Sequence, residues 1–204
     1  MGSNIGRIGN QIRVASRKLH SAVHWVQEER HYVLDTVPNP VEAKTSVEFK
    51  HIERLEDGLA PRLTRLTGKD GNWQRRIDLG HHCILTLHEG ELVGSIWICP
   101  AAWLIGNEQP VGALAADVAF VYDGFVSEVM RGQRLASARL VYIFHEMQRY
   151  GFKRNCTSVE DENLPSVRSV AIVGYRRTES VVRRHRWMMV IWKVEGTPPA
   201  EVLP

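Results

Sequence analysis

The feature that most constrains this fold is a strand, a long helix and a second strand that follow one another over residues 117–161. The stretch DVAFVYDGFV (117–126) is rich in β-branched and aromatic residues and predicts a strand. The apolar spacing of residues 132–150 predicts a helix that Gly151 ends, and NCTSVED (155–161) predicts the second strand. A helical crossover of this kind places its two strands parallel in one sheet. An α/β fold is therefore expected.

Antiparallel strands and further helices are expected on either side of this crossover. HHCILTLHEGELVGSIWICP (81–100) predicts an antiparallel hairpin with a tight turn at residues 89–91. Apolar residues recur at helical spacing from Phe49 to Leu66, where a glycine and a proline divide the stretch into two short helices. The other expected elements are a strand over 31–37, a loose connection over 102–116, a helix over 163–174 and a strand over 188–194. This order predicts a mixed, mostly antiparallel sheet flanked by helices.

An extra helix is expected at the N-terminus. Apolar residues recur at spacings of three, four and seven between Ile5 and Val26, with basic residues among them, and we assign the segment 1–28 to an amphipathic helix. This helix either packs on the core or docks on a membrane surface or a partner, and the sequence leaves both open. His20 and His24 have the spacing of metal ligands on a helix, but no third ligand lies near them in the sequence. We therefore expect no metal.

Length and composition favour one soluble domain. The 204 residues suffice for one well-packed core and are few for two, so residues 1–204 are expected to form a single domain. No apolar run reaches the roughly 20 residues that cross a bilayer, and the N-terminus lacks a signal-peptide core, so a cytoplasmic location is expected. Cys83, Cys99 and Cys156 show no CxxC spacing and predict neither a disulfide framework nor a zinc site. A monomer and a homodimer both remain open.

The charge of the chain does not indicate a nucleic-acid partner. The formal net charge is +3, although basic residues crowd the last quarter from Arg168 to Lys193. A solvated basic face is the expected explanation, and attraction of an anionic ligand or surface is the alternative. No aromatic platform or recognised motif accompanies these residues, so we expect no nucleic acid to bind.

RGQRLAS (131–137), between the strand and the long helix, has the chemistry of an anion site. A helix N-terminus offers up to four unpaired backbone N–H groups and the positive end of the helix macrodipole. Gly132 lets a ligand approach the backbone closely, and the small Ala136 keeps the second turn uncluttered. The turn therefore either holds a phosphate group or is an ordinary helix start, and its own sequence does not decide between them.

Two segments at a fixed separation carry a resemblance to a known family. Arg131 and Ala136 occupy the first and last places of a Gln/Arg-x-x-Gly-x-Gly/Ala turn, with Arg134 at the central glycine. About thirty residues on, the second segment has Asn163, Ser166, Val170 and Gly174-Tyr175. Together these segments resemble the GNAT superfamily of acyl-coenzyme A-dependent N-acyltransferases. The resemblance covers residues 80–194, whereas the first 70 residues match only loosely.

The resemblance implies a GNAT-like sheet with a splayed pair of parallel strands, and acetyl-coenzyme A or another acyl-coenzyme A as cosubstrate. The pantetheine arm would lie between the splayed strands, and the turn would hold the pyrophosphate. The acceptor would be an amine of a small molecule, of the amino sugar or amino acid type. The residues implied for the cosubstrate are Phe125, Val126, Ser127, Arg131, Gly132, Gln133, Arg134, Leu135, Ala136, Ser137, Asn163 and Ser166.

Acyl transfer to an amine needs a group that accepts a proton. The carboxylates on or just after the expected strand are Asp117, Asp123 and Glu128. Asp123 is favoured because it lies in an apolar run, where burial would raise its pKa, and a structural Asp bonded to backbone is the alternative. A tyrosine general acid, which many relatives carry on the second helix, is replaced by Val170.

A different class of function is also open. Arg134 at the glycine place and Val170 at the tyrosine place fit a GNAT-like scaffold whose donor site has decayed. Such a module would dock a partner or a membrane surface through its basic N-terminal helix. The long side chain of Arg134 need not block the turn, since it could point to solvent or pair with a phosphate.

Overall fold

One eight-stranded mixed sheet organises the structure, a computed structural model that describes residues 24–100, 102–105, 109–187, 190–196 and 202–203. The strand order is β10-β9-β1-β8-β7-β4-β3-β2, and β5 and β6 form a separate pair. The strands are β1 (His24–Leu34), β2 (Glu48–Ile52), β3 (His82–His88), β4 (Glu91–Cys99), β5 (Ala102–Ile105), β6 (Gln109–Ala113), β7 (Val118–Val126), β8 (Arg154–Glu160), β9 (Arg176–Trp187) and β10 (Val190–Glu195).

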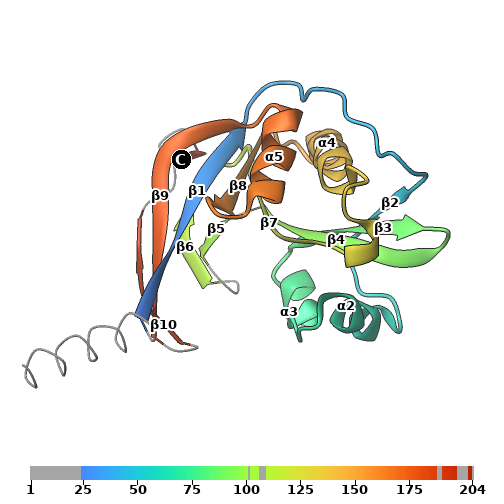
Figure 1. The fold of residues 1–204 in the computed structure, drawn as a ribbon, viewed down its shortest axis with the longest axis horizontal. Helices are drawn as coiled ribbons and strands as arrows, with labels where there is room; N and C mark the ends of the chain where they lie inside the picture. The colour runs from blue at the N-terminus through green and yellow to red at the C-terminus, as the bar shows by residue number, and fades with distance from the viewer. Residues whose placement is uncertain (1–23, 101, 106–108, 188–189, 197–201, 204) are drawn as a thin grey trace, which may run out of the picture.

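Helices cover both faces of this sheet. They are α2 (Leu59–Thr67), α3 (Trp73–Asp78), the 3₁₀ turn η1 (Glu128–Met130), α4 (Leu135–Gln148) and α5 (Leu164–Val173). In Figure 1, α4 and α5 lie on one face and α2 and α3 on the other. None of the helices within the described residues is long and apolar enough to span a membrane.

The crossover and the hairpin are confirmed. Strand β7, helix α4 and strand β8 follow one another, and β7 and β8 are parallel. Helix α4 begins at Leu135, three residues later than expected, because Arg134 has a left-handed backbone with φ 60°. The hairpin turns at Glu89 and Gly90, whose φ angles of 51° and 80° are those of a two-residue turn with both central residues left-handed.

The elements before the hairpin were predicted less well. Residues 48–52 form strand β2 and not a helix, because their alternate side chains face opposite sides of the sheet: Phe49 contacts Tyr142 of α4, and Ile52 belongs to the cluster under α2. The expected second helix is α2, which tolerates Pro61 because the first turn needs no N–H donor there. The short helix α3 was not predicted.

The two ends of the chain also differ from the expectation. The expected helix over 1–28 falls mostly outside the described residues, but its last part is strand, since β1 starts at His24 and pairs with β8 and β9. Strand β9 was missed because its run of arginines lowers its apparent β character. Three of these arginines form ion pairs: Arg176 with Asp35, Arg177 with Asp161 and Arg183 with Glu28. The stretch expected as a loose connection contains β5 and β6.

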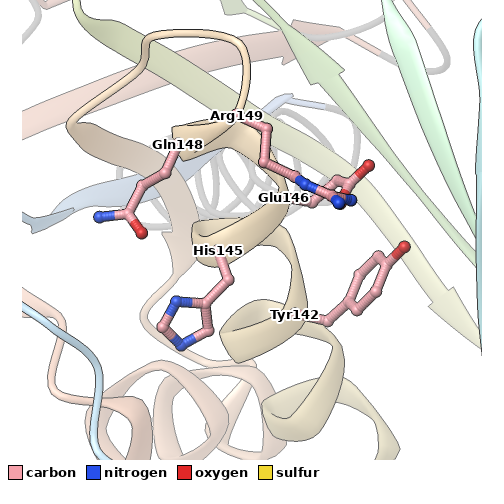
Figure 2. Close-up of a pocket in the computed structure, with 5 residues that line it drawn as sticks. All are labelled: Tyr142, His145, Glu146, Gln148 and Arg149. Carbon is pink, nitrogen blue, oxygen red and sulfur yellow. The ribbon is translucent and has the colours of Figure 1, made fainter.

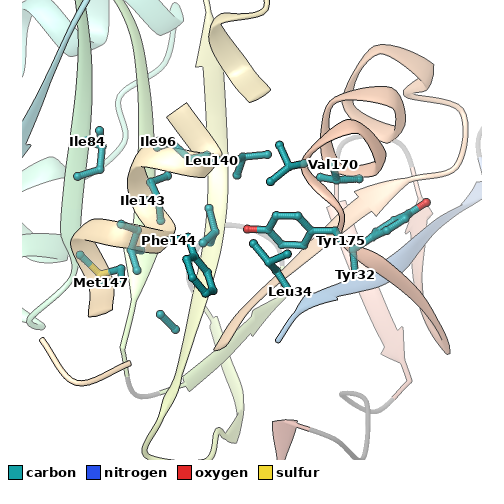
Figure 3. Packing of buried hydrophobic residues seen from close by; sticks show 14 of the residues in the cluster. Tyr32, Leu34, Ile84, Ile96, Leu140, Ile143, Phe144, Met147, Val170 and Tyr175 are labelled. Carbon is teal, nitrogen blue, oxygen red and sulfur yellow. The ribbon is translucent and has the colours of Figure 1, made fainter. Parts of the chain in front are cut away.

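Buried apolar clusters lie under the helices on both faces of the sheet. The core under α4 and α5 joins Leu140, Ile143, Phe144 and Met147 of α4 to sheet and α5 residues, as Figure 3 shows. The core under α2 and α3 includes Leu63, Trp73 and Trp97. Cys83, Cys99 and Cys156 are all buried. Each face of the sheet therefore holds its helices by an independent apolar layer.

Strand β7 parts from β8 halfway along its length. The parallel pairing runs from Val118 to Val121 and goes no further, although β7 continues to Val126. On its other side β7 pairs with β4 through a bulge, where Asp123 and Gly124 together oppose one residue of β4. Asp123 has φ 47°, so the bulge turns the strand sharply at this point. The splayed parallel pair expected from the sequence is thus present.

A buried arginine braces the bulge from the α4 side. Arg139 is 1% exposed, and its Nη1 donates to the Phe125 carbonyl at 3.0 Å and to Thr86 Oγ1 at 3.2 Å. Burial lowers the pKa of Arg139 to about 10, so it stays charged at neutral pH. Gly94 leaves room for this group, since a Cβ there would lie 2.8 Å from Nη1 and 2.9 Å from the Phe125 carbonyl oxygen.

We expect Gly94→Ala to destabilise the fold by about 2 kcal/mol, because the carbonyl oxygen in its way is backbone and cannot turn aside. Urea unfolding measures this difference. Gly112→Ala in β6 is the control, since a Cβ there meets nothing within 4 Å and should change stability by less than about 0.5 kcal/mol. Equal stability of the two variants would contradict this account of Arg139.

Candidate functional site

The turn between β7 and α4 has the backbone of an anion site. Gly132 has φ 80°, and a Cβ there would meet nothing within 4 Å, so the turn is open to a ligand. Helix α4 has no side-chain cap at its N-terminus, and its first amides have no partner one turn earlier in the helix. Arg134 holds the left-handed conformation that a glycine would normally take, at a cost of about 1–2 kcal/mol. The turn therefore keeps its shape despite the missing glycine.

The backbone of β7 faces the gap at one of the three expected positions. The Ser127 amide donates to the Val93 carbonyl of β4 at 2.8 Å. Because backbone groups alternate along a strand, the N–H and C=O of Val126 point the other way, toward the side from which β8 has diverged. The Phe125 carbonyl accepts from Arg139. Val126 is thus the residue placed to pair with an extended ligand arm.

The other expected cosubstrate residues lie around the N-termini of α4 and α5. Asn163 caps α5 through a 3.3 Å hydrogen bond that its Oδ1 accepts from the Ser166 amide. Ser137 is buried and donates to the Ser169 carbonyl, so its hydroxyl ties α4 to α5. The Gln133 carbonyl accepts from the Lys44 amide of the β1–β2 connection, which arches past α5 and α4 in Figure 1. Arg131, Gly132 and Arg134 are exposed, Gln133 and Ala136 are partly buried, and Leu135 is buried.

The opposite face of the bulge carries a charged and aromatic cluster that the sequence did not reveal. Arg76 of α3 is 4% exposed, and its guanidinium lies 4.8 Å from the ring centres of both Trp73 and Trp97 and 5.2 Å from that of Tyr122. Trp73 and Trp97 stack with ring centroids 5.7 Å apart. Cation–π contacts of this kind favour a desolvated arginine. Helix α3 has only six residues, too few for its spacing to stand out in the sequence.

Asp123 lies beside this cluster and forms two ion pairs. Its Oδ2 is 2.8 Å from Arg76 Nη2, and its Oδ1 accepts from Lys69 Nζ at 2.9 Å. Burial acts to raise the pKa of Asp123, but the hydrogen bond from Lys69 and the charge of Arg76 outweigh it, and the pKa is lowered. The rise in pKa expected from the sequence is therefore wrong. The reason is that both cations come from a segment distant in the sequence.

Next to Asp123, a tyrosine and a histidine form a short hydrogen bond. His81 Nδ1 lies 2.6 Å from the hydroxyl oxygen of Tyr122, the first residue of β7 beyond its pairing with β8. Burial, together with the charge of Arg76, lowers the pKa of His81 to about 4. The imidazole is therefore neutral at physiological pH.

The other two expected carboxylates lie away from the bulge. Asp117 precedes the opposite end of β7 and accepts from Arg154, with Nε and Oδ2 3.2 Å apart, and its pKa is lowered by that hydrogen bond. Glu128 on η1 is 82% exposed and pairs with Arg131 at 3.2 Å. Neither is placed beside Tyr122 and Asp123. Val170, which stands at the family's tyrosine place, is buried in the core under α5.

A separate surface hollow of about 410 Å³ lies along the C-terminal half of α4, as Figure 2 shows. It is lined by Tyr142, His145, Glu146, Gln148 and Arg149. These residues are far along the helix from Gly132. The hollow is therefore not part of the turn described above.

Comparisons with known proteins agree with this geometry. The family model described as the acetyltransferase (GNAT) family matches residues 49–175, more than half of the chain. No curated protein sequence matches the chain. The matched segment spans the sheet from β2 through β8, together with α4 and α5, and strands β1, β9 and β10 lie outside it.

Solved structures share the fold at low sequence identity. A GNAT-family protein from Novosphingobium aromaticivorans has a TM-score of 0.53 and 15% identity over 78% of this chain and 63% of its own. A glucosamine N-acetyltransferase region of a fungal multi-domain β-N-acetylglucosaminidase has a TM-score of 0.60 and 13% identity, over 87% of this chain and 23% of its own. An aminoglycoside N-acetyltransferase in complex with coenzyme A has a TM-score of 0.52 and 12% identity, over 65% of this chain and 93% of its own. The chain thus spans less than two thirds of the first two proteins.

We expect Asp123→Asn to lower stability at pH 7 by about 3 kcal/mol, the lower end of the range for breaking a buried ion pair, because it leaves Arg76 without its carboxylate. The folded pKa of Asp123 is below the unfolded value of about 3.9, so its carboxylate stabilises the fold above that pH. This contribution of the carboxylate to the free energy of unfolding is lost as the pH falls through the lowered pKa of Asp123. Urea unfolding of both proteins between pH 7 and pH 2.5 should show the difference shrinking below about pH 4.

Asp57→Asn is the matched control for this series. Asp57 is exposed in the loop before α2, and its change should alter stability by less than about 0.5 kcal/mol at any pH. A difference between wild type and Asp123→Asn that stays constant down to pH 2.5 would rule out the ion pairs as its cause.

Proposed function

We propose that this chain, which belongs to the acetyltransferase (GNAT) family, transfers an acetyl or longer acyl group from acyl-coenzyme A to the amine of a small molecule. The observation that carries the proposal is the joint geometry of β7 and α4. Strand β7 parts from β8 after Val121. Beyond its end, the chain forms an open turn that leads into the N-terminus of α4, where the backbone amides have no helical partner. An extended thioester with a diphosphate at one end needs both features.

In this proposal the amides of residues 132–137 hold the pyrophosphate. The positive end of the α4 macrodipole favours the diphosphate charge there. Exposed Arg131 and Arg134 add positive charge at the same place, and Arg134 can pair with a phosphate while its backbone keeps the turn. This supports a working donor site over a decayed one. The docking alternative would use the N-terminal segment, most of which lies outside the described residues.

The pantetheine arm would extend from the turn into the gap beside β7. Val126 presents its backbone N–H and C=O to this gap and would pair with the amides of the arm. The buried hydroxyl of Ser127, the residue that directly follows β7, has no hydrogen-bond partner among the described residues. The N-termini of α4 and α5 flank the same end of the sheet, so Asn163 and Ser166 would lie on the far side of the arm.

The acceptor would bind on the α3 side of the bulge. Tyr122, Asp123 and Arg76 there combine hydrogen-bonding groups, charge and flat aromatic surface. An amine of the amino sugar or amino acid type suits such a lining, because it carries polar groups over a compact apolar body. Two structural neighbours named for glucosamine and aminoglycoside acetylation lend support to the amino sugar type.

The attacking amine must lose a proton during transfer. Asp123 was the expected acceptor, but it is held by Lys69 and Arg76 with a lowered pKa, so we assign it to anchoring these two cations. The Tyr122 and His81 pair offers a relay: the tyrosine oxygen receives the proton of the amine while its own proton passes to Nδ1 of neutral His81, which becomes an imidazolium cation. The route is short because the two atoms are already 2.6 Å apart.

We expect Gly132→Glu to weaken coenzyme A binding by about 10-fold or more, because it puts a carboxylate beside the proposed pyrophosphate site. Isothermal titration calorimetry with coenzyme A measures the change. Gly151→Glu is a closely matched control. Gly151 also has a positive φ, of 89°, with nothing within 4 Å of its Cβ position, but it follows the other end of α4. Equal affinities for the two variants, or no coenzyme A binding by wild type, would refute the proposed donor site.

We expect His81→Asn to lower kcat by about 100-fold while the KM for the acyl donor stays unchanged, because the proton acceptor is lost and the donor site is not touched. In the assay, the protein is incubated with acetyl-coenzyme A and each member of a panel of amino sugars and amino acids. The release of coenzyme A measures the rate. If Asp123→Asn removes the pH dependence of kcat and His81→Asn leaves it intact, Asp123 and not His81 is the base.

A further inference from the structure

We propose a binding site for a divalent transition ion of the zinc type at the edge of the sheet, with His51, Glu53 and His82 as its ligands. His51 lies on β2, Glu53 follows that strand directly, and His82 begins β3. One ligand atom from each residue lies within 4.8 Å of the others. From the sequence we expected no metal, because the His20 and His24 pair on the expected N-terminal helix had no third ligand near it. The three ligands come from two neighbouring strands that are distant in the sequence, so no short sequence motif reveals them.

The three side chains converge because of strand geometry. His51 and Glu53 are two residues apart and therefore face the same side of the sheet, and His82 is paired close to them on the neighbouring strand. His51 Nε2 lies 2.9 Å from His82 Nδ1, and His82 Nδ1 lies 4.0 Å from Glu53 Oε1. Ligands of a tetrahedral zinc ion lie about 3.4 Å apart for bonds near 2.05 Å. For the ion to bind, the first separation would widen by about 0.5 Å and the second would shorten by about 0.6 Å through side-chain rotations.

The surroundings of His51 are those of a metal ligand. Its other ring nitrogen, Nδ1, lies 3.0 Å from Glu146 Oε1 of α4. A carboxylate on Nδ1 holds the proton there and leaves the lone pair of Nε2 for an ion, as in the carboxylate-histidine-zinc arrangement. Arg149 in turn donates to Glu146 Oε2 at 3.1 Å, and both side chains are visible in Figure 2. The ring of Tyr150 packs edge-on against both histidines at 5.2 Å.

The donor set selects the class of ion. Imidazole nitrogens suit zinc, copper, iron and nickel, whereas magnesium and calcium prefer a shell of oxygens. Glu53 supplies the third ligand, and its side chain is 56% exposed, so solvent can reach the ion. Three protein ligands leave the fourth tetrahedral position for water.

The site lies apart from the proposed acyl-transfer site. His82, Ile84 and Thr86 alternate on the α4 face of β3, whereas Asp123 and Arg76 lie on the α3 face of the sheet. The bound ion would join β2, which is the last strand of the sheet, to β3. It would therefore act as a cross-link that stabilises the edge of the fold.

The test is calorimetry and thermal unfolding of the full chain after treatment with a chelator. We expect one Zn²⁺ per chain to bind and to raise Tm, while Mg²⁺ does neither. Glu53→Gln should weaken Zn²⁺ binding by at least about 10-fold, His82→Gln by about 100-fold or more, and Glu146→Gln by about 10- to 100-fold through the loss of its support for His51. Because Glu53 is exposed, Glu53→Gln should fold normally. It therefore still tests the site if a histidine variant fails to fold.

His88→Gln is the matched control, since His88 lies on the same strand, outside the cluster, with its Nδ1 near the Ser46 carbonyl. It should bind Zn²⁺ as wild type does. The site is refuted if wild type binds no Zn²⁺, or if Glu53→Gln and His82→Gln bind it as tightly as His88→Gln does. Coenzyme A binding should be the same in wild type and Glu53→Gln, so a failure of this site is distinguishable from a failure of the donor site.

Discussion

The bulge in β7 is the constraint on which the proposed site depends. Two residues, Asp123 and Gly124, stand opposite one residue of β4, and the left-handed backbone of Asp123 turns the strand there. Pairing with β8 has ended two residues before, at Val121. Without the extra residue β7 would continue beside β8 and close the gap, and Asp123 would not reach the α3 side. Bulges are found next to active sites for this reason.

Two buried arginines hold this bulge from opposite faces of the sheet. Arg139 of α4 donates to the Phe125 carbonyl, and Arg76 of α3 pairs with the Asp123 carboxylate. The partners of the two guanidinium groups differ. Arg139 donates to a carbonyl and a hydroxyl, whereas Arg76 contacts a carboxylate and three aromatic rings. Burying a charge is costly unless its hydrogen bonds are met, so both helices gain a fixed position relative to β7. These contacts link β7 to α4 on one face and to α3 on the other.

The sequence predicted the crossover and the hairpin because their signals are local. Alternation, turn glycines and the helical spacing of α4 all lie within short windows. Strand β2 was mistaken for a helix, since five residues that face two different cores show no clear period. The partners of Asp123 could not be found in this way. Lys69 and Arg76 lie more than forty residues before it, and only the fold shows that their charges reverse the effect of burial on its pKa.

Arg134 illustrates the same limit of a sequence pattern. In the sequence it replaces a glycine, which raised the question of a decayed donor site. In the structure it has φ 60°, the conformation for which the glycine would be needed, so the backbone shape is retained at a modest energetic cost. A residue pattern records which side chain is usual, whereas the proposed pyrophosphate would contact the backbone. The change at position 134 therefore alters the charge of the turn more than its geometry.

Helix α4 connects the two sites proposed for this protein. Its N-terminus presents unpaired amides for a diphosphate, Arg139 in its second turn fixes the bulge, and Glu146 near its C-terminus supports His51. An anion at the first end and a cation near the last both complement the helix macrodipole. The cation would also stabilise β2, an edge strand with few pairing partners. An ion at the sheet edge would then hold α4 through Glu146 near its C-terminal end, whereas the coenzyme A turn depends on the N-terminal end of the same helix and on the bulge.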